Sequence, residues 1–166
     1  IPESSPSWPN DIQPTTWYLH SAALIATGQW QAALEASAKA LRLEPWSSML
    51  ASHHAALTAW CGRPAEARAM LEDAIATNPQ NSAAPMQDLC MAHLLLGNYR
   101  DAVDAAEKAI GLGADDPMRT GLHVVAACAQ LGELAKATAA LDAVMRALPG
   151  LTIAMLIDSR WRPGSP

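Results

Sequence analysis

Apolar residues recur at spacings of three and four along most of this chain, which is the pattern of an α-helix with one buried face. The clearest stretch follows Gly28 and contains Trp30, Ala33, Leu34, Ser37, Ala40 and Leu41. A second apolar stretch precedes the same glycine and contains Trp17, Leu19, Ala23, Leu24 and Ile25. The pattern therefore predicts two helices joined by a tight turn at Gly28, that is, a helical hairpin.

The outline of this hairpin returns three times downstream. Its glycine recurs at Gly62, Gly97 and Gly132, at spacings of 34, 35 and 35 residues. A fixed period in this range is typical of a solenoid, in which each unit stacks on its neighbours. We predict further helix pairs at 46–60 and 64–77, 82–96 and 99–112, and 117–131 and 134–147, separated by Pro45, Pro79, Pro117 and Pro149, because proline breaks the ladder inside a helix.

The unit resembles the tetratricopeptide repeat family, in which a glycine precedes an aromatic residue and small residues stand where two helices cross. The glycine and aromatic pairs here are Gly28 with Trp30 and Gly97 with Tyr99, and Trp17 matches the aromatic of the first helix. The small columns contain Ala33, Ala67, Ala102 and Ala137, then Ala40, Ala74 and Ala109. The fourth unit departs from the pattern at Leu134 and Val144. The resemblance implies an all-α, right-handed superhelical solenoid of four antiparallel helix hairpins.

The repeats leave a segment at each end of the chain. We place the four units at about 15–47, 48–81, 82–116 and 117–149. Residues 1–14 are a proline-rich arm that we expect to be extended, and its Trp8 is a candidate to lie in the groove of the solenoid. Residues 150–161 predict a capping helix and 162–166 a tail. Because the chain begins at Ile1 rather than Met, we expect a fragment of a larger protein.

The first helices of stacked hairpins line the concave side, so a groove depends on their exposed positions. The candidate partner-binding residues are Tyr18, Ile25, Met49, Ser52, Trp60, Gln87, Met91, Leu94, Arg119 and Leu122. Their apolar character predicts a groove for an apolar or amphipathic peptide, centred on Trp60, Met91 and Leu94. The alternative is that curvature or the capping helix buries part of this surface as core.

Three polar residues occupy one column of successive first helices: His53, Asp88 and His123, at spacings of 35 and 35. We expect a hydrogen-bonded ladder in which Asp88 orients and partly charges one imidazole. Neighbouring helices pack roughly 8–10 Å apart, so a single ion is not readily reached by all three side chains. No metal site is therefore predicted.

Composition narrows the classes of partner and reaction. The formal charge of −5 carries no Lys/Arg run, which argues against nucleic acid and membrane partners. Phosphate loops, nucleophile elbows and paired metal motifs are lacking, so we predict neither an enzyme nor a cofactor. Cys61, Cys90 and Cys128 form no disulfide framework, which favours a reducing, cytoplasmic location.

The sequence thus predicts a non-catalytic protein–protein interaction module that binds a peptide or partner domain in an apolar concave groove. Some tetratricopeptide repeat proteins hold the terminal carboxylate of heat-shock chaperones with several cations. The matching positions here offer only Arg119, so that partner class is not expected. The alternative function is a regulatory or homodimerising segment of a larger bacterial signalling protein, such as a nucleotide cyclase or transcription regulator, whose repeat regions the ending ALPGLTIAMLIDSRW resembles.

Overall fold

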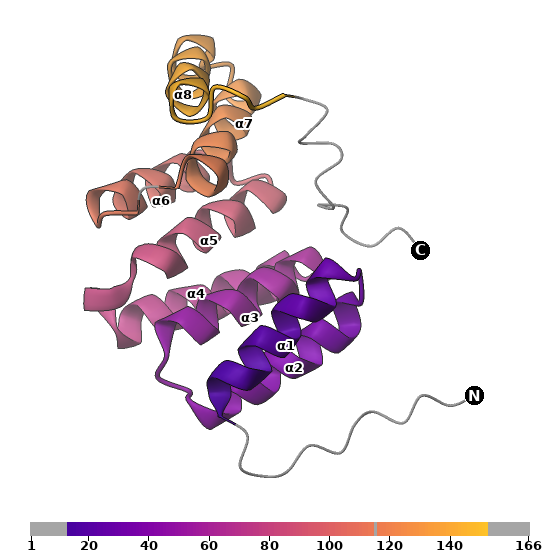
Figure 1. Ribbon diagram of the computed structural model, residues 1–166. Coiled ribbons are helices and arrows are strands. Elements are labelled where there is room, and N and C mark those ends of the chain that lie inside the picture. Colours follow the sequence, from indigo (N-terminus) through magenta and orange to yellow (C-terminus); the bar gives the residue numbers. More distant parts are fainter. Residues whose placement is uncertain (1–12, 115, 153–166) are drawn as a thin grey trace.

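The computed structural model describes residues 13–114 and 116–152, which form a stack of four helical hairpins without a strand among them (Figure 1). The hairpins are α1 (Pro14–Ala26) with α2 (Trp30–Leu43), α3 (Ser48–Trp60) with α4 (Pro64–Thr77), α5 (Ala83–Leu95) with α6 (Tyr99–Gly111), and α7 (Leu122–Gln130) with α8 (Leu134–Ala147). Two short turns, η1 (Pro79–Asn81) and η2 (Pro117–Gly121), precede α5 and α7. The predicted all-α solenoid is confirmed.

The structure corrects the predicted N-terminal arm at one residue. Pro14, which the sequence placed in the extended arm, is instead the first residue of α1. Proline suits this position because the first N–H groups of a helix have no intrahelical partner. The remainder of the predicted arm, with Trp8, and nearly all of the predicted capping helix lie outside the described residues.

The recurring glycine ends the first helix of each hairpin. Gly28, Gly62, Gly97 and Gly132 have φ of 76°, 83°, 77° and 75°, a left-handed conformation that side chains disfavour. The next residue then bonds back across the turn: Gln29 N–H donates to the Leu24 carbonyl at 2.9 Å, and Arg63 N–H donates to that of Thr58 at 3.1 Å. This is the usual glycine-based helix ending, so the period of the repeat follows from turn chemistry.

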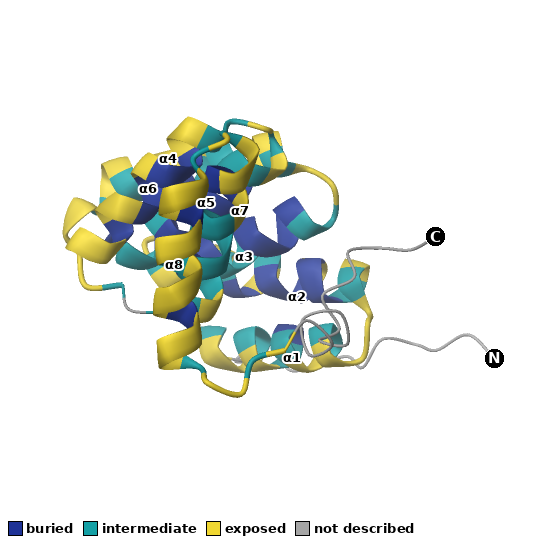
Figure 2. Cartoon of the chain, turned by 90° about the horizontal axis from the view of Figure 1, so that it is seen from above, coloured by how far each residue is buried: buried dark blue, intermediate teal, exposed yellow. Residues whose placement is uncertain are grey.

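The first helices form the inner layer of the stack. Helix α3 packs on α5 and α5 on α7, while each second helix also contacts the first helix of the following hairpin. Ala33, Ala67 and Ala102 are fully buried and Ala137 nearly so, which lets the paired helices approach closely. Figure 2 shows the buried residues gathered inside and the outer surfaces of α4, α6 and α8 largely exposed. The inner wall is therefore continuous across neighbouring units.

The start of the fourth unit departs from the predicted straight helix at 117–131. Pro117–Gly121 forms a single π-helical turn before α7 begins. The Asp116 carboxylate caps it by accepting hydrogen bonds from the N–H groups of Met118, at 3.0 Å, and Arg119, at 3.1 Å. Gly121 lies against the buried side chain of Val144, which leaves no room for a Cβ. This turn sets where Arg119 points.

Replacing Gly121 by alanine is expected to destabilise the protein by about 1–3 kcal/mol, because the added Cβ would lie 2.5 Å from Val144 Cγ2. Alanine in place of glycine ordinarily stabilises a helix. A loss of stability would therefore indicate the steric clash with Val144. Urea unfolding followed by circular dichroism measures the change. The double variant with Val144→Ala should lose much less than the two single losses added together; additive losses would contradict this packing.

Candidate functional site

The inner wall carries a hollow of about 250 Å³ between α1, α3, α5 and η2. Its lining residues come from successive units and are Tyr18, Met49, Ser52, His53, Ala56, Trp60, Ala84, Asp88 and Arg119. Five of the ten predicted partner-binding residues therefore meet in one place: Tyr18, Met49, Ser52, Trp60 and Arg119. Met49, Ser52 and Trp60 share helix α3, and the period of the repeat places Tyr18 and Arg119 on the same inner face in other units.

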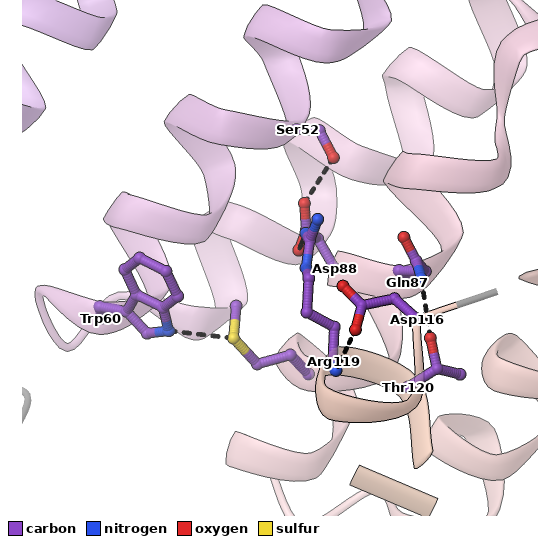
Figure 3. Close-up of polar contacts among 8 residues, drawn as sticks. Ser52, Trp60, Gln87, Asp88, Asp116, Arg119 and Thr120 are labelled. Atoms are coloured by element: carbon purple, nitrogen blue, oxygen red, sulfur yellow. Dashed lines mark hydrogen bonds and ion pairs between the residues drawn. The ribbon is translucent and has the colours of Figure 1, made fainter. Parts of the chain in front are cut away.

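An ion pair between Asp88 and Arg119 lies in the lining of this hollow, and we call it the floor; Figure 3 shows the two side chains. Arg119 donates from Nη2 to Asp88 Oδ1, and Ser52 Oγ donates to Asp88 Oδ2 at 2.5 Å. The Asp88 side chain is only 5% exposed, whereas that of Arg119 is 42% exposed. Burial raises the pKa of Asp88, and the Arg119 charge and the bond from Ser52 oppose that rise. The carboxylate is thus held in place, while part of the guanidinium faces the hollow.

The π-helical turn η2 positions Arg119. Its backbone N–H is held by Asp116, and the neighbouring Thr120 is tied to α5 because Gln87 Nε2 donates to Thr120 Oγ1 at 2.9 Å. Both Gln87 and Thr120 are buried, so this bond lies within the packed interface. Arg119 is therefore anchored by its own backbone as well as by Asp88.

Aromatic and apolar side chains form the walls of the hollow. Trp60 packs edge-on against Trp30, with ring centroids 6.0 Å apart, and its Nε1–H points to Met91 Sδ at 3.0 Å. Tyr18 lies edge-on to His53, with ring centroids 4.7 Å apart. Met49 is 52% exposed at the rim. The hollow therefore combines a charged floor with an apolar rim.

The hydrogen-bonded ladder predicted for His53, Asp88 and His123 is wrong. Asp88 is bonded to Ser52 and Arg119, and His53 Nε2 lies 2.9 Å from Ser21 Oγ on α1. Burial is the main cause that lowers the pKa of both histidines to about 4, so neither is charged near neutral pH. The Asp88 carboxylate binds Arg119 rather than a histidine. A guanidinium carries a fixed positive charge and therefore binds a carboxylate more strongly than a neutral imidazole does.

His53 instead joins the first two hairpins. Ser21 donates its single hydroxyl proton to the Ala33 carbonyl at 2.9 Å, so its oxygen accepts from His53 Nε2–H. In the same way Ser37 donates to the Leu34 carbonyl, and its oxygen accepts from His54 Nδ1–H at 2.7 Å. The paired histidines therefore fasten α3 to both helices of the first hairpin.

The predicted centre of the groove needs correction. Met91 is buried beneath Trp60, Gln87 is buried against Thr120, and Leu94 packs against the main core cluster. Ile25 packs against the smaller cluster, and Leu122 is half-buried outside the hollow. Inward phase alone does not distinguish a groove residue from a core residue, because the curvature of the stack covers part of the wall. The hollow lies nearer to Met49 and Ser52.

The lining residue Ala84 was not expected from the sequence. It precedes Asp88 by four positions and therefore lies one helical turn away on the same face of α5. That phase is visible in the sequence. The phase alone did not mark Ala84 as a site residue, because a methyl side chain has no polar or ionisable group.

A second hollow of about 220 Å³ lies between α2, the first turn of α3 and α4. It is lined by Leu41, Pro45, Trp46, Ser47, Ser48, Ala51, Met70, Asp73, Ala74, Thr77 and Asn78. Trp46 is 70% exposed beside it. None of the predicted partner-binding residues lies there, so the two hollows are separate surfaces.

Other chemistry is limited within residues 13–114 and 116–152. No group of three or more His, Cys, Asp or Glu side chains there is placed to hold a metal ion. Cys90 and Cys128 are buried, and burial raises the pKa of Cys90 to about 12, which makes it a poor nucleophile. Over the same residues, every helix is too short or too polar to cross a bilayer.

Comparison with known proteins agrees with this geometry. A family model described as tetratricopeptide repeat matches residues 62–123. A thermophilic tetratricopeptide repeat protein of Thermus thermophilus is similar in structure with a TM-score of 0.73 and 18% identity, over 92% of this chain and 81% of that one. MamA of Desulfovibrio magneticus RS-1 is similar with a TM-score of 0.63 and 22% identity, over 81% and 75% of the two chains.

A third similar structure contains a bound peptide. It is the first tetratricopeptide repeat domain of Spaghetti (RPAP3) with the HSP90 peptide SRMEEVD, at a TM-score of 0.57 and 16% identity, over 78% of this chain and 94% of that one. No curated protein matches the chain significantly in sequence. The tetratricopeptide repeat family model thus matches residues 62–123, and the stacked hairpins with their glycine turns have the same fold as these solved tetratricopeptide repeat structures.

Proposed function

We propose that this chain is a non-catalytic interaction module that binds a segment of a partner protein in the hollow between α1, α3, α5 and η2. The observation that carries the proposal is the makeup of the hollow, where exposed Met49 and half-buried Tyr18 and Trp60 lie beside an anchored Arg119. Apolar walls with a few fixed polar groups are typical of binding sites. The peptide bound by the similar RPAP3 domain supports the same class of partner.

The size of the hollow favours a side chain over a cofactor. Its volume of about 250 Å³ lies below the roughly 300–1,000 Å³ of small-molecule pockets. A peptide would insert one residue and lay its backbone along the inner wall. The flexible thioether of Met49 can adapt to different residues at the rim.

The chemistry of the hollow favours binding over catalysis. The Asp88 carboxylate is already engaged by Arg119 and Ser52, so it is poorly placed to accept a proton from a substrate. His53 Nε2 is held by Ser21, and its pKa of about 4 leaves it uncharged near neutral pH. A general acid or base should instead titrate near the working pH.

Replacing Met49 by aspartate is expected to weaken binding roughly tenfold or more, because a carboxylate at the rim meets an apolar side chain of the ligand. Peptides selected from a random display library against the wild-type protein serve as the probe, and fluorescence anisotropy measures their affinity. Leu95→Asp is the matched control, since Leu95 is also 52% exposed but does not line the hollow.

The two variants separate specific binding from loss of folding. Both replaced side chains are half-exposed, so circular dichroism should report native helicity for both proteins. Equal affinities of Met49→Asp and Leu95→Asp for the selected peptides would rule out this hollow as the binding site.

A second candidate function is pairing with another copy of the chain. Leu134, Leu141 and Met145 are exposed on one face of α8, at spacings of seven and four residues. An apolar helical face of this kind fits a partner helix. Sedimentation of the chain as a monomer up to concentrations of about 100 μM would eliminate this candidate, because obligate interfaces are tighter than that.

A further inference from the structure

We propose that Asp88 determines the charge preference of the hollow: by pairing with Arg119 it makes the site accept neutral apolar segments and disfavour acidic ones. This inference rests on the function proposed above and specifies the class of partner. Asp88 acts here as a specificity-determining residue.

The pairing removes the electrostatic advantage that a lone arginine would give to an acidic ligand. Arg119 is the cation of the lining, and its side chain is 42% exposed, so a ligand can reach it. Asp88 lines the same hollow and is bonded directly to that guanidinium. A ligand carboxylate that approaches Arg119 therefore meets a fixed negative charge at a similar distance, and attraction and repulsion nearly cancel.

Asp88 cannot easily turn away to leave Arg119 free. Its side chain is 5% exposed, Ser52 donates to its second oxygen at 2.5 Å, and helix α5 fixes its backbone. Breaking the pair would leave a buried carboxylate without its cation, which is strongly unfavourable. An acidic ligand therefore cannot take the place of Asp88 at low cost.

The other titratable groups near Arg119 do not restore a positive field. Asp116 precedes η2, and its carboxylate accepts a hydrogen bond from the backbone N–H of Arg119 rather than adding a positive charge (Figure 3). His53, from α3, and His123, from α7, each have a pKa lowered to about 4, mainly by burial, so they add no charge near neutral pH. The charge of the Arg119 guanidinium is thus balanced by Asp88, and neither histidine adds a second positive charge.

Replacing Asp88 by asparagine changes the charge and keeps much of the geometry. An asparagine carbonyl oxygen can still accept a hydrogen bond from Arg119 or from Ser52. The variant therefore leaves an arginine whose charge is no longer compensated within the floor. It should gain affinity for carboxylates, which is harder to obtain from a damaged fold than a loss of affinity.

The experiment compares two peptides by fluorescence anisotropy: the acidic SRMEEVD and a neutral counterpart, N-acetylated SQMQQVN with an amidated C-terminus, which carries no charged group. We expect the wild-type protein to prefer the neutral peptide. Asp88→Asn should bind SRMEEVD at least roughly tenfold tighter than the wild type does, with a much smaller change for the neutral peptide. Asp73→Asn, which removes one negative charge beside the other hollow, should behave as the wild type.

Several results would overturn the inference. They are a wild-type protein that prefers SRMEEVD, an unchanged affinity of Asp88→Asn for it (including no binding by either protein), or an equal gain in Asp73→Asn. A wild-type measurement covers the case in which Asp88→Asn does not fold. The affinity of SRMEEVD for the wild type should change little between low and high salt, and clear strengthening at low salt would contradict a compensated floor.

Failure of this inference can be told apart from failure of the proposed function. If Met49→Asp weakens binding of the display-selected peptides and Leu95→Asp does not, the hollow binds peptides whatever its charge preference. If those two variants behave alike, the binding site itself has been misplaced.

Discussion

Replacing Leu57 by alanine is expected to lower the free energy of unfolding by about 3 kcal/mol. Leu57 is fully buried and belongs to the cluster with Ala33 and Leu34, against which Leu24 and Ile25 also pack. This cluster joins the first hairpin to α3. Because a solenoid unit contacts only its neighbours, distant units cannot compensate for a loss of packing at this joint.

Urea unfolding followed by circular dichroism at 222 nm measures the loss, with the slope of the transition as a check on compactness. Leu95→Ala is the control, because an exposed leucine should change stability by no more than about 0.5 kcal/mol. A loss below about 1 kcal/mol for Leu57→Ala would mean that the first hairpin is not held to the stack by this cluster.

Lowering the pH from 7 to about 4 is expected to destabilise the fold through His53 and His123. Each has a folded-state pKa of about 4 against an ordinary value of 6.5. Between these values the unfolded chain binds more protons, so the contribution is fully present above 6.5 and is lost as the pH falls toward 4. The shift corresponds to roughly 2–3 kcal/mol for each histidine. Asp88, whose pKa is raised, acts in the opposite sense and reduces the total.

Unfolding free energies measured at pH 7 and pH 4.5 test this dependence. His53→Gln and His123→Gln should each flatten it, since glutamine can occupy a buried polar position without taking up a proton. Leu95→Ala, which replaces an exposed side chain that does not titrate, should leave the slope unchanged. Parallel pH profiles for the wild type and the double variant would show that the two histidines are not the source of the acid sensitivity.

The fold was predictable from sequence because local chemistry determines most of it. A glycine with positive φ ends each first helix, and a buried alanine follows five residues later in every unit, as at Gly28 and Ala33. Both features depend on residue type within a short window. The period then follows without knowledge of any long-range contact.

The π-helical turn at Pro117–Gly121 was not predictable in the same way. It combines the cap from Asp116 with the lack of space at Gly121, and that restriction comes from Val144 on another helix. The sequence period places Arg119 on the inner wall. It does not reveal that the turn directs the side chain toward Asp88.

The sequence predicted where the site lies on the inner wall, but it did not predict which side chains bind one another there. The phase of the first helices correctly brings Tyr18, Met49 and Trp60 together, but the same phase includes Met91, which is buried. The partner of Asp88 depends on side chains from three units, and sequence reasoning paired it with the histidines of its own column. Whether Asp88 binds a guanidinium or an imidazole depends on the positions of the side chains in space. The repeat period does not give those positions.

Binding in the hollow between α1, α3, α5 and η2 is tested most directly by a structure of the chain with the tightest display-selected peptide bound. We predict that one apolar side chain of the peptide lies between Met49 and Trp60, with a peptide carbonyl near the exposed side of Arg119. A peptide seated in the hollow beside Trp46, or on the outer surfaces of α4 and α6, would contradict this prediction.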